Sequence, residues 1–225
     1  MTIEDTKAFS LQTREMFTNI APRYDFLNRL LSVGQDRYWR KKAIQLLNPD
    51  GNDRILDVAT GTGDIILEVA KRNLTTKIFG IDFCQRMLNL GRIKVSQNGY
   101  KQAVSFQVGS GESLPFIDQS FDGIVCAFGV RNFANVKLGL KEFYRVLKPG
   151  GMFCWTDLRD AKTMATLPSL FESKGFEIVE SADVAKEVIQ ALDEINETKM
   201  KAIEEKVPQS VRKSFETFAG VKGTP

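Results

Sequence analysis

A short apolar segment that runs into two closely spaced glycines constrains the fold more than any other feature of this sequence. Residues 55–58 are typical of a buried strand, and Gly61 and Gly63 follow before a helical pattern that begins at Asp64. Glycine has no Cβ, so the backbone can turn sharply there and a ligand can approach it closely. A strand that leads into such a turn and a helix builds a nucleotide-binding corner. The segment therefore predicts a Rossmann-like α/β domain with a ligand at the turn.

The residues around this turn indicate which ligand fits it. A pyrophosphate cofactor needs a third glycine where this chain has Ile66, and the Gly-Lys-Ser/Thr signature of a phosphate loop is absent. The carboxylate of Asp57 would repel phosphates but suits the ammonium group of a methionine moiety. Asp82 ends the next predicted strand nineteen residues after Gly63, where a carboxylate suits ribose hydroxyls. The pattern indicates S-adenosylmethionine, and the alternative is an ordinary turn between a strand and a helix.

The composition limits which chemistry the chain can perform. Histidine is absent, which excludes a histidine base, a Ser-His-Asp triad and histidine-bound metal. Cys84, Cys126 and Cys154 lack the spacing of metal ligands, so no metal site is expected. Acid–base chemistry must therefore come from carboxylates, Tyr, Arg, the backbone or a cofactor.

Size, charge and cysteine content suggest where the protein works. At 225 residues the chain can bury the core of one α/β domain with an appendage. A formal net charge of +3 gives no reason to expect nucleic acid as a partner. The three cysteines are widely spaced, no apolar run approaches the ~20 residues of a membrane span, and no secretory signal is visible. These features favour the cytoplasm.

Strands and helices alternate from Arg54 onward, which predicts βαβ units and a mostly parallel sheet flanked by helices. The expected helices are 64–72, 85–97, 137–147 and 165–174. The expected strands are 54–58, 77–81, 104–108, 121–127, 151–156 and 176–179.

The chain divides into three regions. Residues 1–50 are rich in aromatic and basic side chains and look helical over 10–47, so we expect a substrate or lid segment. Residues 51–180 hold the alternating pattern and form the expected cofactor-binding domain. Residues 181–225 form an expected helical appendage, because apolar side chains recur at helical spacing among many Lys and Glu in 183–219.

Further motifs resemble those of one protein family. They are the segments 16–28 with 36–40, 112–116 with 120–122, and 127–133. Together with the glycine turn they resemble the ubiquinone/menaquinone biosynthesis C-methyltransferase family over about residues 14–151, most specifically at 21–25 and 128–132. The resemblance implies a class I methyltransferase fold. It also implies transfer of a methyl group from S-adenosylmethionine to a ring carbon of a prenylated quinol.

The resemblance also implies roles for individual residues. Ser110 and Gly111 fall at the adenine end of the cofactor, and Ala127 stands where the family often has a serine. The whole implied cofactor set is Asp57, Gly61, Thr62, Gly63, Asp82, Ser110, Gly111 and Ala127. The implied catalytic residues, on the quinol side of the pocket, are Tyr24, Arg131 and Asn132.

A quinol ring is electron-rich, so these residues need little acid–base power. Arg131 could stabilise a phenolate and orient a water that takes the proton, while Asn132 and Tyr24 could hydrogen-bond ring oxygens. Each residue also has a structural alternative. Arg131 could form a salt bridge, Tyr24 could pack the N-terminal helix, and Asn132 could be a turn residue or N-cap of the helix at 137–147.

Two other functions are compatible with the sequence. The family usually has Leu-Glu-Phe after the strand at 151–156, whereas this chain has Trp155-Thr-Asp157. Residues 155–225 look more like the tail of a methyltransferase for another lipid, phenolic or polyketide-like acceptor. A non-catalytic adenosylmethionine-binding protein is the alternative from a different class. A dehydrogenase is disfavoured by Ile66.

The expected partner is a hydrophobic, quinol-type small molecule. The basic and aromatic segment 37–42 suits contact with an anionic membrane surface, although a solvated helix face with Trp39 in the core explains it as well. A homodimer is also compatible with the sequence.

The fold that the resemblance implies usually closes its sheet with a seventh, antiparallel strand after 176–179. Residues 183–219 have helical spacing, and the apolar residues at 218–222 are interrupted by glycine. We therefore predict six strands, no seventh strand from 183–225, and a chain truncated before the last strand.

Overall fold

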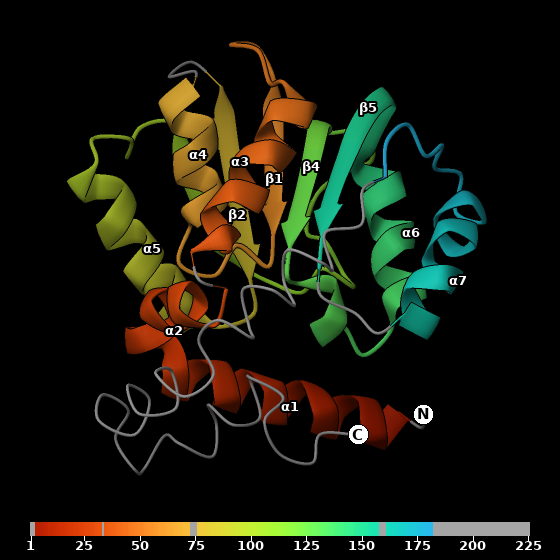
Figure 1. Cartoon of the computed structure of the whole chain (residues 1–225), viewed down its shortest axis with the longest axis horizontal. Coiled ribbons are helices and arrows are strands. Elements are labelled where there is room, and N and C mark those ends of the chain that lie inside the picture. The colour runs from red at the N-terminus through yellow and green to blue at the C-terminus, as the bar shows by residue number, and fades with distance from the viewer. Residues whose placement is uncertain (1–2, 33, 73–75, 158–160, 182–225) are drawn as a thin grey trace.

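Five parallel strands form the central sheet, in the spatial order β3-β2-β1-β4-β5 (Figure 1). Ile55 of β1 pairs with Ile78 of β2 on one side and with Gly123 of β4 on the other. The strand order therefore reverses between β1 and β4, and open α/β sheets bind ligands at the carboxyl ends of their strands beside such a reversal. The strands are β1 Arg54–Val58, β2 Lys77–Asp82, β3 Val104–Val108, β4 Phe121–Ala127 and β5 Leu147–Thr156.

The computed structural model of the chain describes residues 3–32, 34–72, 76–157 and 161–181. Helices cover both faces of the sheet (Figure 1). They are α1 Ile3–Ile20, η1 Ala21–Arg23, α2 Tyr24–Leu31, α3 Gln35–Leu47, α4 Asp64–Arg72, α5 Gln85–Gln97, η2 Val130–Asn132, α6 Val136–Val146 and α7 Ala161–Glu172. The architecture confirms the predicted Rossmann-like α/β class with a parallel sheet.

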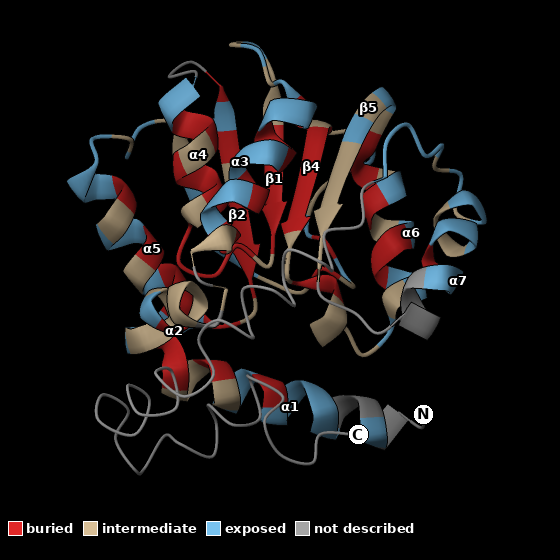
Figure 2. Ribbon diagram, in the orientation of Figure 1, coloured by how far each residue is buried: buried red, intermediate tan, exposed pale blue. Residues whose placement is uncertain are grey.

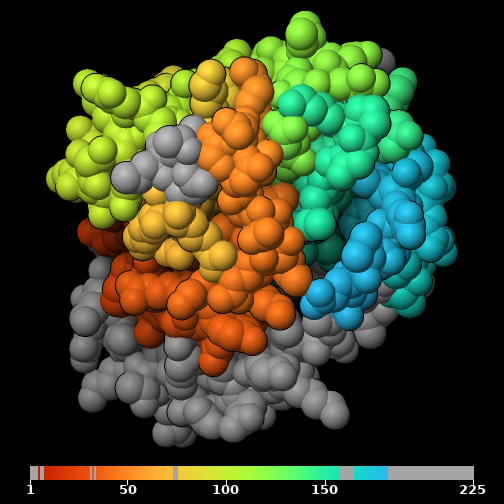
Figure 3. Space-filling view, turned by 90° about the horizontal axis from the view of Figure 1, so that it is seen from above, coloured from red at the N-terminus to blue at the C-terminus, as the bar shows by residue number. Residues whose placement is uncertain are grey.

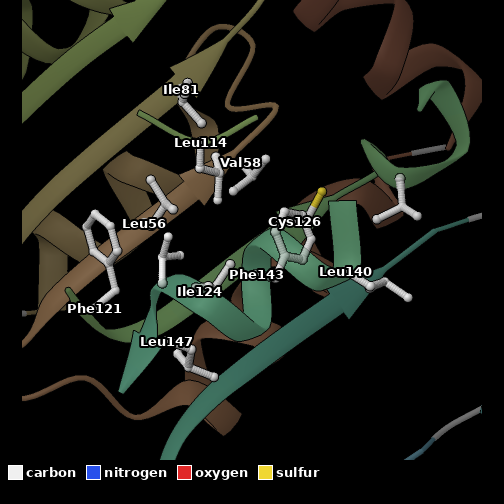
Figure 4. Close-up of a cluster of buried hydrophobic side chains, with 12 residues drawn as sticks. Leu56, Val58, Ile81, Leu114, Phe121, Ile124, Cys126, Leu140, Phe143 and Leu147 are labelled. Carbon is white, nitrogen blue, oxygen red and sulfur yellow. The ribbon is translucent and has the colours of Figure 1, made fainter. Parts of the chain in front are cut away.

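Alternation along the strands divides the core into two layers. On one face, Leu56 and Ile124 pack with α6 through Phe143, as the close-up in Figure 4 shows. On the other face, Ile55 and Val125 pack with apolar side chains of α3, α4 and α5. Strands β1 and β4 are buried almost throughout, as expected for a parallel sheet covered on both faces (Figure 2).

The N-terminal helices α1 and α2 lie across the carboxyl ends of the strands (Figure 1). A third apolar cluster fixes them there, in which Phe17, Ile20 and Leu27 contact Cys84 and Met87 at the start of α5. The helices thus cover the edge of the sheet where a ligand is expected.

The expected strand at 176–179 is wrong, because no strand is present there. Phe176 packs against Tyr144 and Phe153, with ring centroids 5.6 and 5.5 Å apart, but Val179 is 82% exposed. Phe176 is thus held by aromatic packing, whereas the end of the segment is exposed. Of the six predicted strands, the described part of the chain forms five.

Other boundaries also differ from the prediction, most clearly the starts of β5 and α7. Strand β5 begins at Leu147, not at residue 151, because Leu147 already pairs with Phe121 across a register shift in the ladder. Helix α7 begins at Ala161, earlier than the predicted 165. The predictions about residues 183–225 lie outside the described residues.

Candidate cofactor and substrate site

A pocket opens at the carboxyl ends of β1, β2 and β4, beneath α1. Its open space, mouth included, is about 840 Å³. Its walls come from α1, the start of α2, the glycine turn, the end of β2 with the start of α5, and the loops after β3 and β4. The lining residues are Ser10, Thr13, Arg14, Phe17, Tyr24, Ala59, Gly61, Asp82, Phe83, Met87, Gly109, Ser110, Gly111, Glu112, Ala127, Phe128, Gly129, Asn132 and Phe133.

Asp82 and the glycine turn meet in this pocket. The backbone N–H of Gly61 donates to Oδ2 of Asp82 over 2.9 Å, and that of Cys84 donates to Oδ1 over 2.8 Å. Gly61 has a φ of 56°, a conformation that glycine adopts without strain. Burial raises the pKa of Asp82 to about 6 despite these two bonds. The result is an ionisable, rigidly held acceptor at the pocket wall.

Asp57, Thr62 and Gly63 do not line the main pocket. Asp57 and Thr62 line a second, smaller pocket that shares Tyr24 with the larger one. The hydroxyl of Thr60 donates to Oδ2 of Asp57 over 2.6 Å, and burial raises the pKa of Asp57 to about 7.

Gly63 lines neither of these two pockets. A Cβ on it would lie 3.3 Å from the ring of Phe106, and its φ is 80°. Of the three predicted residues in the turn, Gly61 therefore lines the main pocket, Thr62 lines the smaller one and Gly63 shapes the turn.

The loop after β3 provides a tight wall. A Cβ on Gly111 would lie 2.4 Å from Cζ of Phe133 and 2.8 Å from Cγ1 of Val58, so only glycine fits there. The hydroxyl of Ser110 accepts the backbone N–H of Glu112 over 3.1 Å, which fixes the loop. Ser110 and Gly111 share the pocket with the predicted Ala127 of β4.

Tyr24 lines both pockets from the start of α2. Its ring packs edge-on against Phe17 at 6.1 Å, and a Cβ on Gly61 would lie 3.5 Å from its Cε1 atom. Burial raises the pKa of Tyr24, and the positive charges of Arg40 and Arg131 oppose that rise. Tyr24 therefore both packs the N-terminal helices and faces the pocket.

Asn132 and Arg131 are neighbours in the loop after β4 but have different surroundings. Asn132 lines the pocket, and its Nδ2 donates to the carbonyl oxygen of Phe128 over 3.2 Å. It is not the N-cap of α6, because Asn135 caps that helix by accepting the N–H of Leu138. Arg131 is not among the described residues that line the pocket.

Arg131 lies beside Asp157 at the end of β5. Its Nε is 3.7 Å from Oδ1 of Asp157, and its backbone N–H donates to Oδ2 over 2.9 Å. The guanidinium also lies 5.7 Å from the ring centre of Phe128, which has a φ of 60°. A bulky residue in this left-handed region is strained, and such strain concentrates at functional sites.

Sequence reasoning missed the contribution of α1 to the pocket. Ser10, Thr13 and Arg14 line its mouth. Their spacing of three and four residues puts them on one helix face, which was a usable signal. Asp157 was also missed, and nothing local to it indicates a pairing with Arg131 twenty-six residues earlier.

The sheet order and the pocket position are those of class I S-adenosylmethionine-dependent methyltransferases, and solved structures share this fold. The chain resembles the cyclase SpnF with a TM-score of 0.74 at 22% identity, covering 92% of this chain and 87% of that one. It also resembles a SAM-dependent methyltransferase from Aquifex aeolicus, with a TM-score of 0.60 at 22% identity over 72% of this chain and 93% of that one.

The chain belongs to the ubiE/COQ5 methyltransferase family, whose model matches residues 3–166. It is 54% identical over 139 residues to the ubiquinone/menaquinone biosynthesis C-methyltransferase UbiE of Geotalea daltonii, covering 61% of this chain and 59% of that protein. It is 47% identical over 142 residues to the demethylmenaquinone methyltransferase of Bacteroides fragilis, covering 63% and 58%. The chain thus spans about three fifths of the length of these relatives.

Proposed function

We propose that this protein is an S-adenosylmethionine-dependent methyltransferase that methylates a ring carbon of a prenylated quinol. One observation carries the proposal: Gly61, Asp82, Tyr24 and Asn132, which come from separate family motifs, line one pocket. Family membership and two relatives named for quinone methylation support the same activity. The relatives' names also favour a quinol over the other acceptors that the sequence left open.

The pocket has suitable partners for the ribose and for the adenine ring of the cofactor. Ribose hydroxyls can donate to the carboxylate of Asp82, whose two backbone bonds leave lone pairs free. Gly111 lines the same pocket without a side chain, because Phe133 and Val58 lie where its Cβ would be, so the pocket wall there is backbone that a flat ring can approach. Ser110 and Ala127 line the same pocket, while Asp57 and Thr62 line the smaller pocket beside it and Gly63 shapes the turn. When bound, the cofactor supplies an electrophilic methyl group.

The protein's own contribution to the reaction is orientation and electrostatics. Alignment of the acceptor carbon alone can account for ~7–11 kcal/mol of the barrier. The hydroxyl of Tyr24 and the amide of Asn132 hydrogen-bond the ring oxygens. The positive charge of Arg131 lowers the pKa of Tyr24 against the rise that burial causes, so its field reaches the pocket. We propose that the same charge stabilises negative charge that develops on the quinol oxygen.

We also propose that residues 1–50 act as a lid and 51–180 as the cofactor domain, with peripheral contact to a membrane through α3. Arg37, Tyr38, Lys41 and Lys42 of this helix are exposed, while Trp39 is buried. The space-filling view shows α3 (orange) at the surface beside α4 (Figure 3). In the described part of the chain, no helix is long and apolar enough to cross a bilayer. A cytoplasmic enzyme that touches the membrane surface could reach a prenylated substrate.

A panel of acceptors tests the proposed substrate class. Release of S-adenosylhomocysteine is measured with demethylmenaquinol, a demethylated benzoquinol, a simple phenol and a fatty acid, each under reducing conditions. The proposal predicts turnover with at least one quinol and none with the fatty acid. Turnover with the phenol or the fatty acid alone would replace the quinol assignment, and cofactor binding without any turnover would favour a non-catalytic role.

A further inference from the structure

Six charged side chains connect the N-terminal helices to the elements behind the glycine turn. Three are carboxylates and three are cations, so the group is balanced in charge. The N-terminal members are Asp25 and Arg29 of α2 and Asp36 and Arg40 of α3, and the core members are Asp64 of α4 and Lys94 of α5. This network is separate from the walls of the main pocket and had no role in the proposed chemistry.

Lys94 is the member that joins three elements at one atom. Its Nζ lies 2.5 Å from Oδ2 of Asp25 and 2.7 Å from Oδ1 of Asp64, and it donates to the hydroxyl of Thr62 over 2.9 Å. An ammonium group has three N–H donors, so these partners match its full capacity. The side chain of Lys94 is only 22% exposed, which limits screening by water and salt.

Thr62 makes the connection to the cofactor turn direct. Its hydroxyl donates to Oδ1 of Asp25 over 2.5 Å while it accepts from Lys94. Thr62 belongs to the turn that carries Gly61, and Asp25 follows Tyr24 at the start of α2. The same three side chains therefore join the turn to the helix that bears the pocket-lining tyrosine.

Asp64 fixes the other side of the network. Arg40 lies 3.2 Å and Arg29 lies 3.5 Å from its Oδ2. Burial alone would raise the pKa of Asp64, but Arg40, Lys94 and Arg29 together hold it below its usual value. Asp64 thus stays ionised at neutral pH and anchors the cations of three different helices.

We propose that Lys94 is a positioning residue that latches the N-terminal helices onto the cofactor turn. Its pair with Asp25 determines how firmly α1 and α2 close over the pocket, and therefore how tightly the cofactor binds. The identity of that cofactor rests on the proposed function, whereas the latch itself does not.

The test compares Lys94→Met with Lys71→Met in the full chain. Lys71 is a matched control, because its side chain is 51% exposed and pairs at 3.0 Å with Glu68 on the surface of α4. Hydrogen exchange is measured for α1 and α2 without ligand, and the dissociation constant of S-adenosylmethionine is measured by calorimetry.

We expect Lys94→Met to speed exchange in α1 and α2 and to weaken cofactor binding, each by about tenfold, as for a half-buried ion pair. Exchange in the central strands should stay unchanged, Lys94→Arg should restore part of both effects, and Lys71→Met should change neither. Accelerated exchange throughout the sheet would overturn the proposal, because it would mean a general loss of stability.

A double-mutant cycle tests whether the latch depends on the pair of Lys94 with Asp25. Asp25→Asn should reproduce the effects of Lys94→Met, and the double variant should be little worse than either single variant. Fully additive effects would overturn the proposed pair. Asp25→Asn also stands alone as a test if Lys94→Met does not fold, since unchanged exchange in α1 and α2 would then contradict the latch. If the wild type binds no S-adenosylmethionine, the proposed function fails while the exchange measurement still decides the latch.

Discussion

The backbone N–H of Gly61 donates a hydrogen bond to Oδ2 of Asp82 over 2.9 Å, which joins the turn after β1 to the end of β2. Gly61 has the left-handed conformation of the turn, and the N–H of Cys84 holds the other oxygen of Asp82, so the carboxylate is fixed at the wall of the pocket from two sides. The pair is therefore the structural centre of the proposed cofactor site.

Replacement of Asp82 should weaken cofactor binding. Asp82→Ala removes a charged acceptor of ribose hydroxyls, which is worth about 1.5–3 kcal/mol, or roughly 10- to 150-fold in the dissociation constant. Calorimetric titration with S-adenosylmethionine measures the change. An unchanged affinity would rule out Asp82 as the ribose acceptor.

The affinity of the wild type should also depend on pH. Because the pKa of Asp82 is raised to about 6, the carboxylate becomes protonated and loses its charge as the pH falls through that value. We expect the dissociation constant to rise between pH 7 and pH 5 in the wild type and to vary less in Asp82→Asn. Equal pH dependence in both proteins would assign the titration to another group.

Asp57→Asn should change stability in a pH-dependent way. The folded pKa of Asp57, about 7, lies above its unfolded value, so the contribution of this group to stability is present below about pH 4 and is lost as the pH rises through 7. Asparagine keeps an acceptor for Thr60 but carries no buried charge. The variant should gain on the order of 2 kcal/mol relative to the wild type between pH 5 and pH 8. Thermal melts at both pH values measure this, and a constant difference would contradict it.

Arg131→Ala should separate catalysis from folding. Loss of a preorganised positive charge lowers turnover on the order of 10²–10³-fold. Cofactor affinity should remain near that of the wild type, because Arg131 lies beside Asp157 outside the pocket lining. Parallel loss of cofactor binding and of the folded state would instead assign Arg131 a purely structural role.

Gly111→Ala should destabilise the loop after β3. The added methyl group would meet Phe133 at 2.4 Å and Val58 at 2.8 Å, and such overpacking costs about 1–3 kcal/mol. Denaturant unfolding measures the loss. Because Phe133 is one of the two obstacles, Gly111→Ala in a Phe133→Leu background should cost less than in the wild type. The same loss in both backgrounds would mean that the ring is not the obstacle.

The sequence predicted the parts of the site that are set by local structure. Strand β1 and its turn follow from an apolar segment ending in two glycines, and Asp82 follows from its place at the end of the next strand. Carboxyl ends of parallel strands meet at one edge, so the meeting of Gly61 with Asp82 could be expected from topology alone.

The remaining features depend on contacts between distant segments. Residues 176–179 have strand-like composition, but a strand also needs a partner edge, and only Phe176 finds a packing surface. The salt bridge of Arg131 depends on where β5 ends, and the pocket face of α1 depends on how that helix lies over the sheet. Local patterns carry no signal for the salt bridge, and for α1 the helical spacing gives the shared face but not the surface that this face covers.

A crystal structure with S-adenosylhomocysteine tests the central claim most directly. We predict that the ligand occupies the pocket at the ends of β1 and β2, with its ribose hydroxyls on the carboxylate of Asp82 and its adenine beside Ser110 and Gly111. Its sulfur should face the side of the pocket lined by Tyr24 and Asn132. A ligand bound elsewhere, or a ribose that makes no contact with Asp82, would contradict this account.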